Sequence, residues 1–166
     1  MTRRTPLKRP RKTAREKLEA SHPSHGKAFA IPAAMRRPGG AKTMVVPRPL
    51  DVDALMRAPR KGRVVTMGLI RAELARRAGV DTCCPLTTGI FARLAAEASE
   101  EDSAAGKKRV TAWWRTVRDD GSLNDKFPGA GAEQARRLRR EGVRIAAGKG
   151  RSRIHDLERL VVKLGR

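Results

Sequence analysis

Apolar residues in the middle of the chain recur at the three- and four-residue spacing of an amphipathic helix. In residues 67–78 this spacing places on one face the aliphatic side chains Leu69, Ile70 and Leu74. Thr66 stands at the N-cap position, where a hydroxyl can accept a hydrogen bond from the first helical turn. Gly79 stands where a left-handed residue commonly ends a helix. The pattern therefore predicts a helix over 67–78 with both ends specified.

A second amphipathic segment follows after a short turn and predicts a helix over residues 87–99. Its buried stripe is expected to comprise Ile90, Phe91, Leu94 and Ala98. The opposite face, expected to point away from the core, comprises Thr87, Thr88, Ala92, Arg93 and Ala96. Two helices joined by a short turn are typical of a helix-turn-helix domain, whose second helix enters a groove of DNA.

Shorter patterns predict the remaining elements. Helices are expected over residues 13–20, 51–58, 132–141 and 154–164. Residues 110–117 have the β-branched and aromatic composition of a strand, and the Asp-Gly turn at 119–122 predicts a hairpin with a return strand from Leu123. The expected fold is mainly α with a small β hairpin, in a winged helix-turn-helix-like domain over 48–146. Residues 147–166 are expected to form a linker and a C-terminal amphipathic helix.

Basic residues strongly outnumber acidic residues in this chain. Its 166 residues include 38 Lys and Arg against 17 Asp and Glu, which gives a formal net charge of +21. Residues 1–47 hold twelve of the basic residues and two of the acidic ones, with many prolines and little apolar surface. We expect 1–47 to be a disordered basic arm that adds affinity for nucleic acid. Duplex DNA is the expected polyanionic partner, and an anionic membrane surface is the alternative.

The sequence contains no feature that indicates a membrane protein, a secreted protein or a metalloprotein. No stretch is apolar over the roughly 18 residues that a membrane span needs, and no apolar segment follows the basic N-terminus. Cys83 and Cys84 are adjacent, which favours neither a disulfide between them nor a zinc site. We therefore expect no metal, no cofactor and no membrane association, in a cytoplasmic, nucleoid-associated bacterial protein.

Short motifs between residues 48 and 146 stand in a distinctive order. They are KGRVVT at 61–66, TTG at 87–89, AWWRTV at 112–117, DG at 120–121, and a glycine-rich stretch over 129–143 that closes with LRREG. In this order they resemble the DNA-binding domain of the 6-O-alkylguanine-DNA alkyltransferases, also called methylated-DNA–protein-cysteine methyltransferases. The resemblance is greatest to the alkyltransferase-like members of that family, which have Trp in place of the acceptor Cys and do not transfer the alkyl group.

The resemblance implies which residues stand at the alkyl-transfer site. In the family a Cys thiolate accepts the alkyl group, and its pKa is lowered by a His that a Glu orients. Trp113 stands at the position of the Cys, Trp114 at that of the His, and Glu141 at that of the Glu. Because an indole does not accept the alkyl group, the resemblance implies a non-catalytic protein of DNA repair, whose base pocket at these three residues senses alkylated guanine. A simpler interpretation makes the tryptophans two strand residues, one in the core and one at the surface.

The resemblance also places the residues expected to contact DNA. Met67 stands where the family has the Tyr that acts on the target phosphate, and Leu86 stands where it has the Arg finger. A leucine can still wedge between bases. With the outer face of the second helix and the nearby cations included, the expected DNA contacts are Arg63, Thr66, Met67, Leu86, Thr87, Thr88, Arg93 and Arg115.

Two other functions are open at this point. An active alkyltransferase would need another nucleophile, and Cys84 is the candidate because the dipole of the predicted second helix would lower the pKa of a thiol at its start. A nucleoid or regulatory protein would bind DNA or RNA without sensing a lesion.

Overall fold

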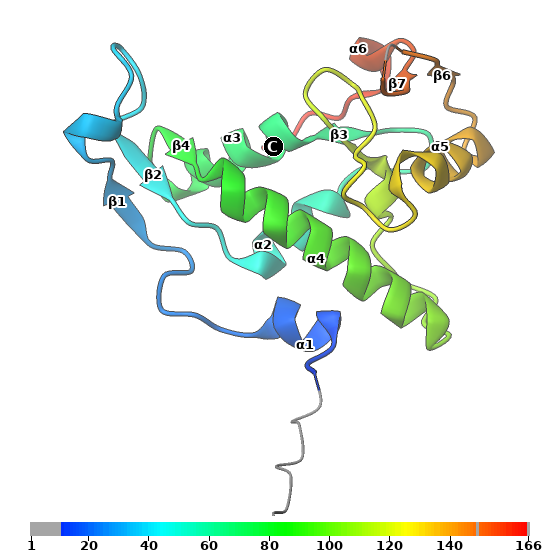
Figure 1. Ribbon diagram of the computed structural model, residues 1–166, viewed down its shortest axis with the longest axis horizontal. Coiled ribbons are helices and arrows are strands. Elements are labelled where there is room, and N and C mark those ends of the chain that lie inside the picture. The colour runs from blue at the N-terminus through cyan, green and yellow to red at the C-terminus, as the bar shows by residue number, and fades with distance from the viewer. Residues whose placement is uncertain (1–10, 149, 166) are drawn as a thin grey trace, which may run out of the picture.

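The computed structural model describes residues 11–148 and 150–165, which form a mostly helical α/β fold with three small sheets (Figure 1). The helices are α1 (Ala14–Glu19), α2 (Pro49–Met56), α3 (Met67–Ala78), α4 (Pro85–Ala104), α5 (Ala130–Arg140) and α6 (Leu157–Leu160), and the 3-10 turns are η1 (Ala33–Met35) and η2 (Trp113–Arg115). The strands are β1 (Ala28–Ala30), β2 (Thr43–Val45), β3 (Val65–Thr66), β4 (Thr82–Cys83), β5 (Thr116–Val117), β6 (Ile145–Ala146) and β7 (Arg153–Ile154).

The structure confirms the helix predicted over 67–78 as α3, with the predicted bounds and the predicted capping residues. The side chain of Thr66 accepts a hydrogen bond from Leu69 N at 3.2 Å, which satisfies one of the free donors of the first turn. Gly79 follows the last helical residue with φ of 65°, a left-handed conformation that costs glycine little. Helix α3 thus begins directly after β3, and the turn to α4 begins at Gly79.

Helix α4 runs through the middle of the molecule, and both α1 and α2 pack against it (Figure 1). Its buried face differs from the predicted stripe: Ile90 is exposed and only Ala98 of that stripe is fully buried. Residues predicted to point outward are completely buried instead, namely Thr88, Ala92 and Ala96. The prediction placed the large apolar side chains in the core, whereas the close packing of α1 and α2 against α4 needs small ones.

The N-terminal segment corrects the expectation of a disordered arm, because residues 11–47 are folded. The predicted helix near 13–20 is confirmed as α1, which begins with a reciprocal capping box between Thr13 and Glu16. Leu18 is only 1% exposed in the interface with α4. Strand β1 pairs antiparallel with β2, and β2 pairs parallel with β4. Residues 1–10 of the predicted arm lie outside the described residues.

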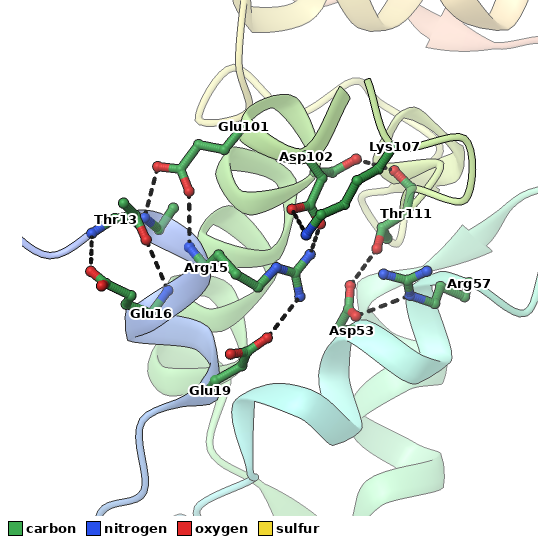
Figure 2. A network of polar contacts seen from close by, with 12 residues as sticks. Thr13, Arg15, Glu16, Glu19, Asp53, Arg57, Glu101, Asp102, Lys107 and Thr111 are labelled. Atoms are coloured by element: carbon green, nitrogen blue, oxygen red, sulfur yellow. Dashed lines mark hydrogen bonds and ion pairs between the residues drawn. The ribbon is translucent and has the colours of Figure 1, made fainter. Parts of the chain in front are cut away.

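Polar contacts from the end of α4 hold α1 in place (Figure 2). The carboxylate of Glu101 accepts hydrogen bonds from Ala14 N at 2.8 Å and Arg15 N at 3.0 Å. The Arg15 guanidinium pairs with Asp102, which also binds Lys107 Nζ at 2.7 Å. Four of these partners are charged groups whose hydrogen bonds are stronger than neutral ones. Local composition alone therefore underestimated the order of this segment.

The hairpin predicted over 110–123 is wrong. Residues 113–115 form η2, and β5 pairs in parallel with β3 instead of turning back on a return strand. The Asp-Gly turn does form, with Gly121 at φ of 77°. Antiparallel pairs occur elsewhere, between β1 and β2 and between β6 and β7. The aromatic residues that suggested a strand are Trp113 and Trp114. Trp113 is buried in the core instead, and Trp114 packs against it.

The C-terminal helix predicted over 154–164 is shorter than expected, since α6 has one turn. Val161 forms a parallel bridge with Val64, next to β3. Leu157, Leu160 and Val161 pack on a small core cluster that includes Val117 and Leu138. The segment is therefore part of the domain and not an appendage. Among the described residues, no helix combines the length and the apolar character needed to cross a bilayer.

Candidate nucleic-acid interface

A groove of about 470 Å³ runs along the first half of α4, between the start of α3 and the loop after β5. We call it the α4 groove, and its lining residues are Met67, Arg71, Pro85, Leu86, Gly89, Ile90, Arg93, Arg118, Asp119, Asn124 and Lys126. Its walls come from three separate segments of the chain. The fold therefore brings together side chains that are up to about sixty residues apart in the sequence.

Positive charge dominates the α4 groove. Four of its lining residues are cations, namely Arg71, Arg93, Arg118 and Lys126, and one is an anion, Asp119. The Asp119 carboxylate is already engaged, because Arg71 Nη2 donates to it at 2.9 Å and Gly68 N also donates to it. Like charges that line a groove focus the electrostatic field within it, so the groove attracts a ligand of opposite charge. The lining of the α4 groove therefore fits an anionic ligand.

Two large apolar side chains stand exposed on the α4 wall of the groove. Leu86 is 71% exposed and Ile90 is 52% exposed. They are four residues apart, so they lie on the same face of the helix, one turn from each other. Gly89 beside them has open space around its missing side chain. Apolar residues exposed within a charged lining are typical of a surface that contacts a ligand.

The structure brings only some of the predicted DNA contacts into this groove. Met67, Leu86 and Arg93 line it. Arg93 Nε donates to Glu97 Oε1 at 2.7 Å, an exposed pair one turn apart that a phosphate can replace at small cost. Thr66 is buried as the cap of α3.

The two threonines of α4 differ in their access to solvent. Thr87 is half-buried, and its hydroxyl lies 3.4 Å from the carbonyl oxygen of Cys84. Thr88 is completely buried, and its hydroxyl donates to the same carbonyl at 2.7 Å. The Thr88 hydroxyl also lies 3.4 Å from Cys83 Sγ. Thr88 therefore has a structural contact where the sequence predicted a contact with DNA.

Arg63 and Arg115 lie away from the α4 groove. The Arg115 guanidinium forms a bidentate contact with Glu141 and donates from Nη1 to the carbonyl oxygen of Pro59 at 2.8 Å. Its side chain is only 17% exposed. Arg63 donates from Nη1 to the carbonyl oxygen of Arg159 and lines a different cavity. Arg115 thus ties chain segments together, and its predicted phosphate contact is not available at the surface.

Trp113 fills the core and presents no face to a ligand. Its side chain is 0% exposed, and its Nε1 donates to Glu100 Oε1 at 2.6 Å. Its ring meets the rings of Trp114 and Phe127 edge-on, with centroids 5.9 and 5.6 Å apart. Such edge-to-face contacts add to the stabilisation from burial. The residue predicted to line a base pocket is thus enclosed by the protein.

The Arg137 guanidinium covers both tryptophans. Its carbon lies 5.1 Å from the ring centroid of Trp113 and 4.8 Å from that of Trp114, within the range of cation–π attraction. It also pairs with Glu100 at 2.9 Å and with Glu133 at 2.7 Å. In the sequence, Arg137 is one of four arginines within residues 136–140. The four-residue spacing from Glu133 was the available signal for an ion pair.

Glu141 is the centre of a second buried network. It accepts hydrogen bonds from Trp114 Nε1 at 2.8 Å, from Gly62 N at 2.9 Å and from the Arg115 guanidinium. Burial raises the pKa of Glu141, but the hydrogen bonds from Arg115, Gly62 and Trp114 outweigh burial, so the pKa is lowered overall. Glu141 is therefore ionised and saturated with donors near neutral pH.

The two cysteines are free thiols that directly precede α4, Cys83 at the end of β4 and Cys84 at the N-cap. Burial raises the pKa of the Cys83 thiol, which makes it a poor nucleophile. Cys84 is half-buried and is the N-cap residue of α4, but it does not line the α4 groove. No group of three or more His, Cys, Asp or Glu side chains that could hold a metal ion occurs within 11–148 and 150–165.

Several residues of the α4 groove were not found from the sequence. Arg71, Arg118, Asn124 and Lys126 line it, and none was a predicted contact. Their local sequence contains no motif that distinguishes them from other surface residues. Only the approach of the loop after β5 to the start of α3 makes them neighbours, and the bond from Gly68 N to Asp119 is one contact that holds the two segments together.

These features define a mostly helical α/β protein with a basic groove along one long helix, an enclosed tryptophan and a second, partly buried tryptophan packed against it. No protein-family model and no curated protein matches the chain. Two solved structures are similar to it. One is S. pombe Atl1 in complex with damaged DNA containing O6-carboxymethylguanine, at 20% sequence identity and a TM-score of 0.47, covering 70% of this chain and 94% of that chain. The other is S. pombe ATL in complex with DNA, at 21% identity and a TM-score of 0.49, with the same coverage.

Proposed function

We propose that this protein binds duplex DNA in the α4 groove and transfers no alkyl group. The observation that carries the proposal is the lining of the groove, which combines four cations and one carboxylate with the exposed side chains of Leu86 and Ile90. In this proposal α3 and α4 act as a helix-turn-helix pair, and the first half of α4 is the element that enters the groove of the DNA.

Each kind of residue in the lining has a role in this proposal. Arg93, Arg118 and Lys126 neutralise backbone phosphates and release condensed counterions, which is the main source of sequence-independent affinity. Leu86 and Ile90 contact apolar parts of the base edges or wedge between bases. The net charge of +21 draws the duplex to the protein before contact.

The absence of catalysis in this proposal depends on Trp113 and Trp114. Trp113 stands at the position where the alkyltransferase family has its acceptor thiolate, and it is fully enclosed. Trp114 stands where the resemblance places the family's proton acceptor, but its Nε1 donates a hydrogen bond to Glu141. An indole nitrogen that donates cannot deprotonate a thiol. The thiol of Cys83 has the raised pKa of a buried group.

The salt dependence of duplex binding tests the proposal. A protein that neutralises several phosphates loses affinity with a slope of about −0.9 per phosphate in a plot of log K against log salt. The double variant Arg93→Gln, Lys126→Gln should reduce that slope by about 1.8. The matched control is Lys27→Gln, Arg37→Gln, which removes the same charge from exposed residues near β1 and η1. A flat affinity for the wild type, or equal slopes for the two variants, would overturn the proposal.

Sensing of an alkylated guanine is the second candidate function, and one observation favours it. The α4 groove has an open volume of about 470 Å³ beside Met67, Leu86 and Asn124, and Asn124 carries an amide that can hydrogen-bond a base edge. Because Trp113 is enclosed, an extruded base would be held in this groove. Affinities for plain duplex, duplex with O6-alkylguanine and RNA separate the candidates. Equal affinity for both duplexes would indicate a nucleic-acid-binding protein without lesion sensing.

A further inference from the structure

A second basic cavity, of about 290 Å³, lies outside the α4 groove. We call it the C-terminal cavity, and its lining residues are Arg63, Gly142, Arg144, His155, Asp156, Arg159 and Leu160. Three segments contribute to it: Arg63 before β3, the chain that leaves α5, and the stretch from the end of β7 through α6. The chemistry proposed above does not use it.

Backbone contacts hold these three segments in position. Val64 N donates to the carbonyl oxygen of Leu160 at 3.0 Å, and Val162 N donates to that of Val64 at 2.8 Å. His155 N donates to the carbonyl oxygen of Arg144 at 2.9 Å. Backbone hydrogen bonds on both sides of a cavity fix the positions of the Cα atoms from which the lining side chains extend. The cavity is therefore a built feature of the fold and not a gap between loose loops.

The lining of the C-terminal cavity carries an excess of positive charge. Asp156 is its one carboxylate, and it is shared by Arg144 Nη2 at 2.6 Å and His155 Nδ1 at 2.8 Å. The Arg63 guanidinium reaches across to the carbonyl oxygen of Arg159. The exposed guanidinium of Arg159 has no partner within the described residues. Two arginines and a histidine are thus held in place while a third arginine keeps all its donors.

More cations surround this cavity. Gly62 N donates to Glu141 at 2.9 Å, which brings the loop before β3 against the end of α5. Two basic pairs with exposed side chains flank the lining residues along the chain: Arg60 and Lys61 precede Arg63, and Arg139 and Arg140 precede Gly142. Clustered guanidinium groups offer paired N–H donors that match the oxygens of a phosphate.

We propose that the C-terminal cavity binds a phosphate group of the same duplex that occupies the α4 groove, an inference that rests on the proposed function. Arg63 precedes Met67 of the groove by four residues, so their Cα atoms are at most about 14 Å apart. Each strand of a duplex carries a phosphate about every 3.4 Å along the axis. A duplex that extends past Met67 from the α4 groove would therefore carry phosphates near Arg63, which lines the C-terminal cavity together with Arg144 and Arg159.

Removal of two cations from the cavity tests this inference. In Arg144→Gln, Arg159→Gln, loss of one neutralised phosphate should reduce the slope of log K against log salt by about 0.9. Between 50 and 200 mM salt, the wild type should then lose about 3.5-fold more affinity than the variant does. The control Lys27→Gln, Arg37→Gln should keep the wild-type slope. The single variant Arg159→Gln removes no contact within the protein, so it separates a phosphate contact from a folding defect.

Side-chain NMR of the same proteins distinguishes the failure of this inference from that of the proposed function. On titration with duplex DNA, the guanidinium signals of Arg63, Arg144 and Arg159 should shift together with that of Arg93. Shifts at Arg93 alone, with wild-type salt slope in the cavity variants, would overturn the second phosphate contact and leave the groove proposal intact. Absence of any shift at Arg93 would overturn the groove proposal itself.

Discussion

The indole Nε1 of Trp114 donates a hydrogen bond to Glu141 Oε1 at 2.8 Å, and the same carboxylate receives the Arg115 guanidinium. The resemblance to alkyltransferases implied a glutamate that orients a histidine at this place. Here the carboxylate instead ties η2 to the end of α5 and to the backbone of Gly62. The carboxylate serves here as a structural link, because all its partners are donors that never release a proton near neutral pH.

Replacement of this carboxylate should destabilise the protein. Glu141→Gln leaves the Arg115 charge without its partner, and the two side chains are only 9% and 17% exposed. Breaking a buried ion pair from one side costs about 3 kcal/mol, at the lower end of the usual range because Gln keeps one acceptor. Urea unfolding measures the loss. Glu158→Gln, at an exposed residue of α6, is the control, and an equal effect of the two variants would contradict the role of Glu141.

The packing of α1 on α4 predicts that Leu18 contributes to the stability of the fold. This side chain is 1% exposed, so Leu18→Ala should lower the free energy of unfolding by about 2–3 kcal/mol. Its exposed neighbour Lys17 supplies the control, since Lys17→Ala should change stability by less than about 0.5 kcal/mol. If both variants unfold at the wild-type urea concentration, α1 contributes nothing to the fold and residues 11–47 behave as the arm that the sequence predicted.

Stability should decrease in acid through two carboxylates in particular. Hydrogen bonds from Arg76 and Arg77 lower the pKa of Glu73 from 4.5 to about 2, and those from Arg136 and Arg137 lower the pKa of Glu133 to about 2. A folded-state pKa below the unfolded value stabilises the fold above about pH 4.5, and this contribution is lost as pH falls toward 2.

Urea unfolding between pH 6 and pH 2.5 measures this acid dependence. The double variant Glu73→Gln, Glu133→Gln should be less stable than the wild type at pH 6 and should show a shallower further loss below about pH 4.5. The control Glu158→Gln should keep the steep wild-type dependence. Parallel curves for the double variant and the wild type would show that these pairs do not stabilise the fold.

The exposed apolar side chains of α4 should tolerate a charge in the free protein but not in the complex. Ile90 is 52% exposed, so Ile90→Asp should leave the free energy of unfolding within about 0.5 kcal/mol of the wild type. A carboxylate against the DNA backbone should lower duplex affinity by about tenfold or more, which corresponds to about 1.4 kcal/mol. Met35→Asp, at a 74% exposed residue of η1, places the same charge elsewhere and should bind DNA like the wild type.

Incubation with duplex containing O6-methylguanine should leave the mass of the protein unchanged. The resemblance implies that Trp113 stands at the acceptor position, and neither Cys83 nor Cys84 lines the α4 groove. Intact mass spectrometry after incubation measures any transfer of the methyl group to the protein, and the variant Cys84→Ala is the matched control. A stoichiometric methyl adduct on the wild type that is missing from Cys84→Ala would identify Cys84 as a nucleophile and contradict a non-catalytic protein.

Elements whose signals are local could be predicted from the sequence, and α3 is the best case. Its cap, its apolar spacing and its terminal glycine all lie within 14 consecutive residues, and the structure has the helix as predicted. Residues 110–117 are the contrary case. Their β-rich composition could serve a strand or a packed core, and only the partners decide between the two. Trp113 meets Glu100 and Phe127, residues that no local pattern connects to it.

The sequence by itself determined the excess of positive charge, the bounds of α3, and the absence of a thiol and an imidazole at Trp113 and Trp114. These depend on residue identity or on hydrogen bonds within one turn. Only the tertiary structure decided which face of α4 is buried, whether 11–47 folds, and which cations share a surface with Leu86. Those outcomes depend on contacts between segments far apart in the chain, where small side chains such as Ala92 and Ala96 allow close approach and charged groups such as Glu101 find their donors.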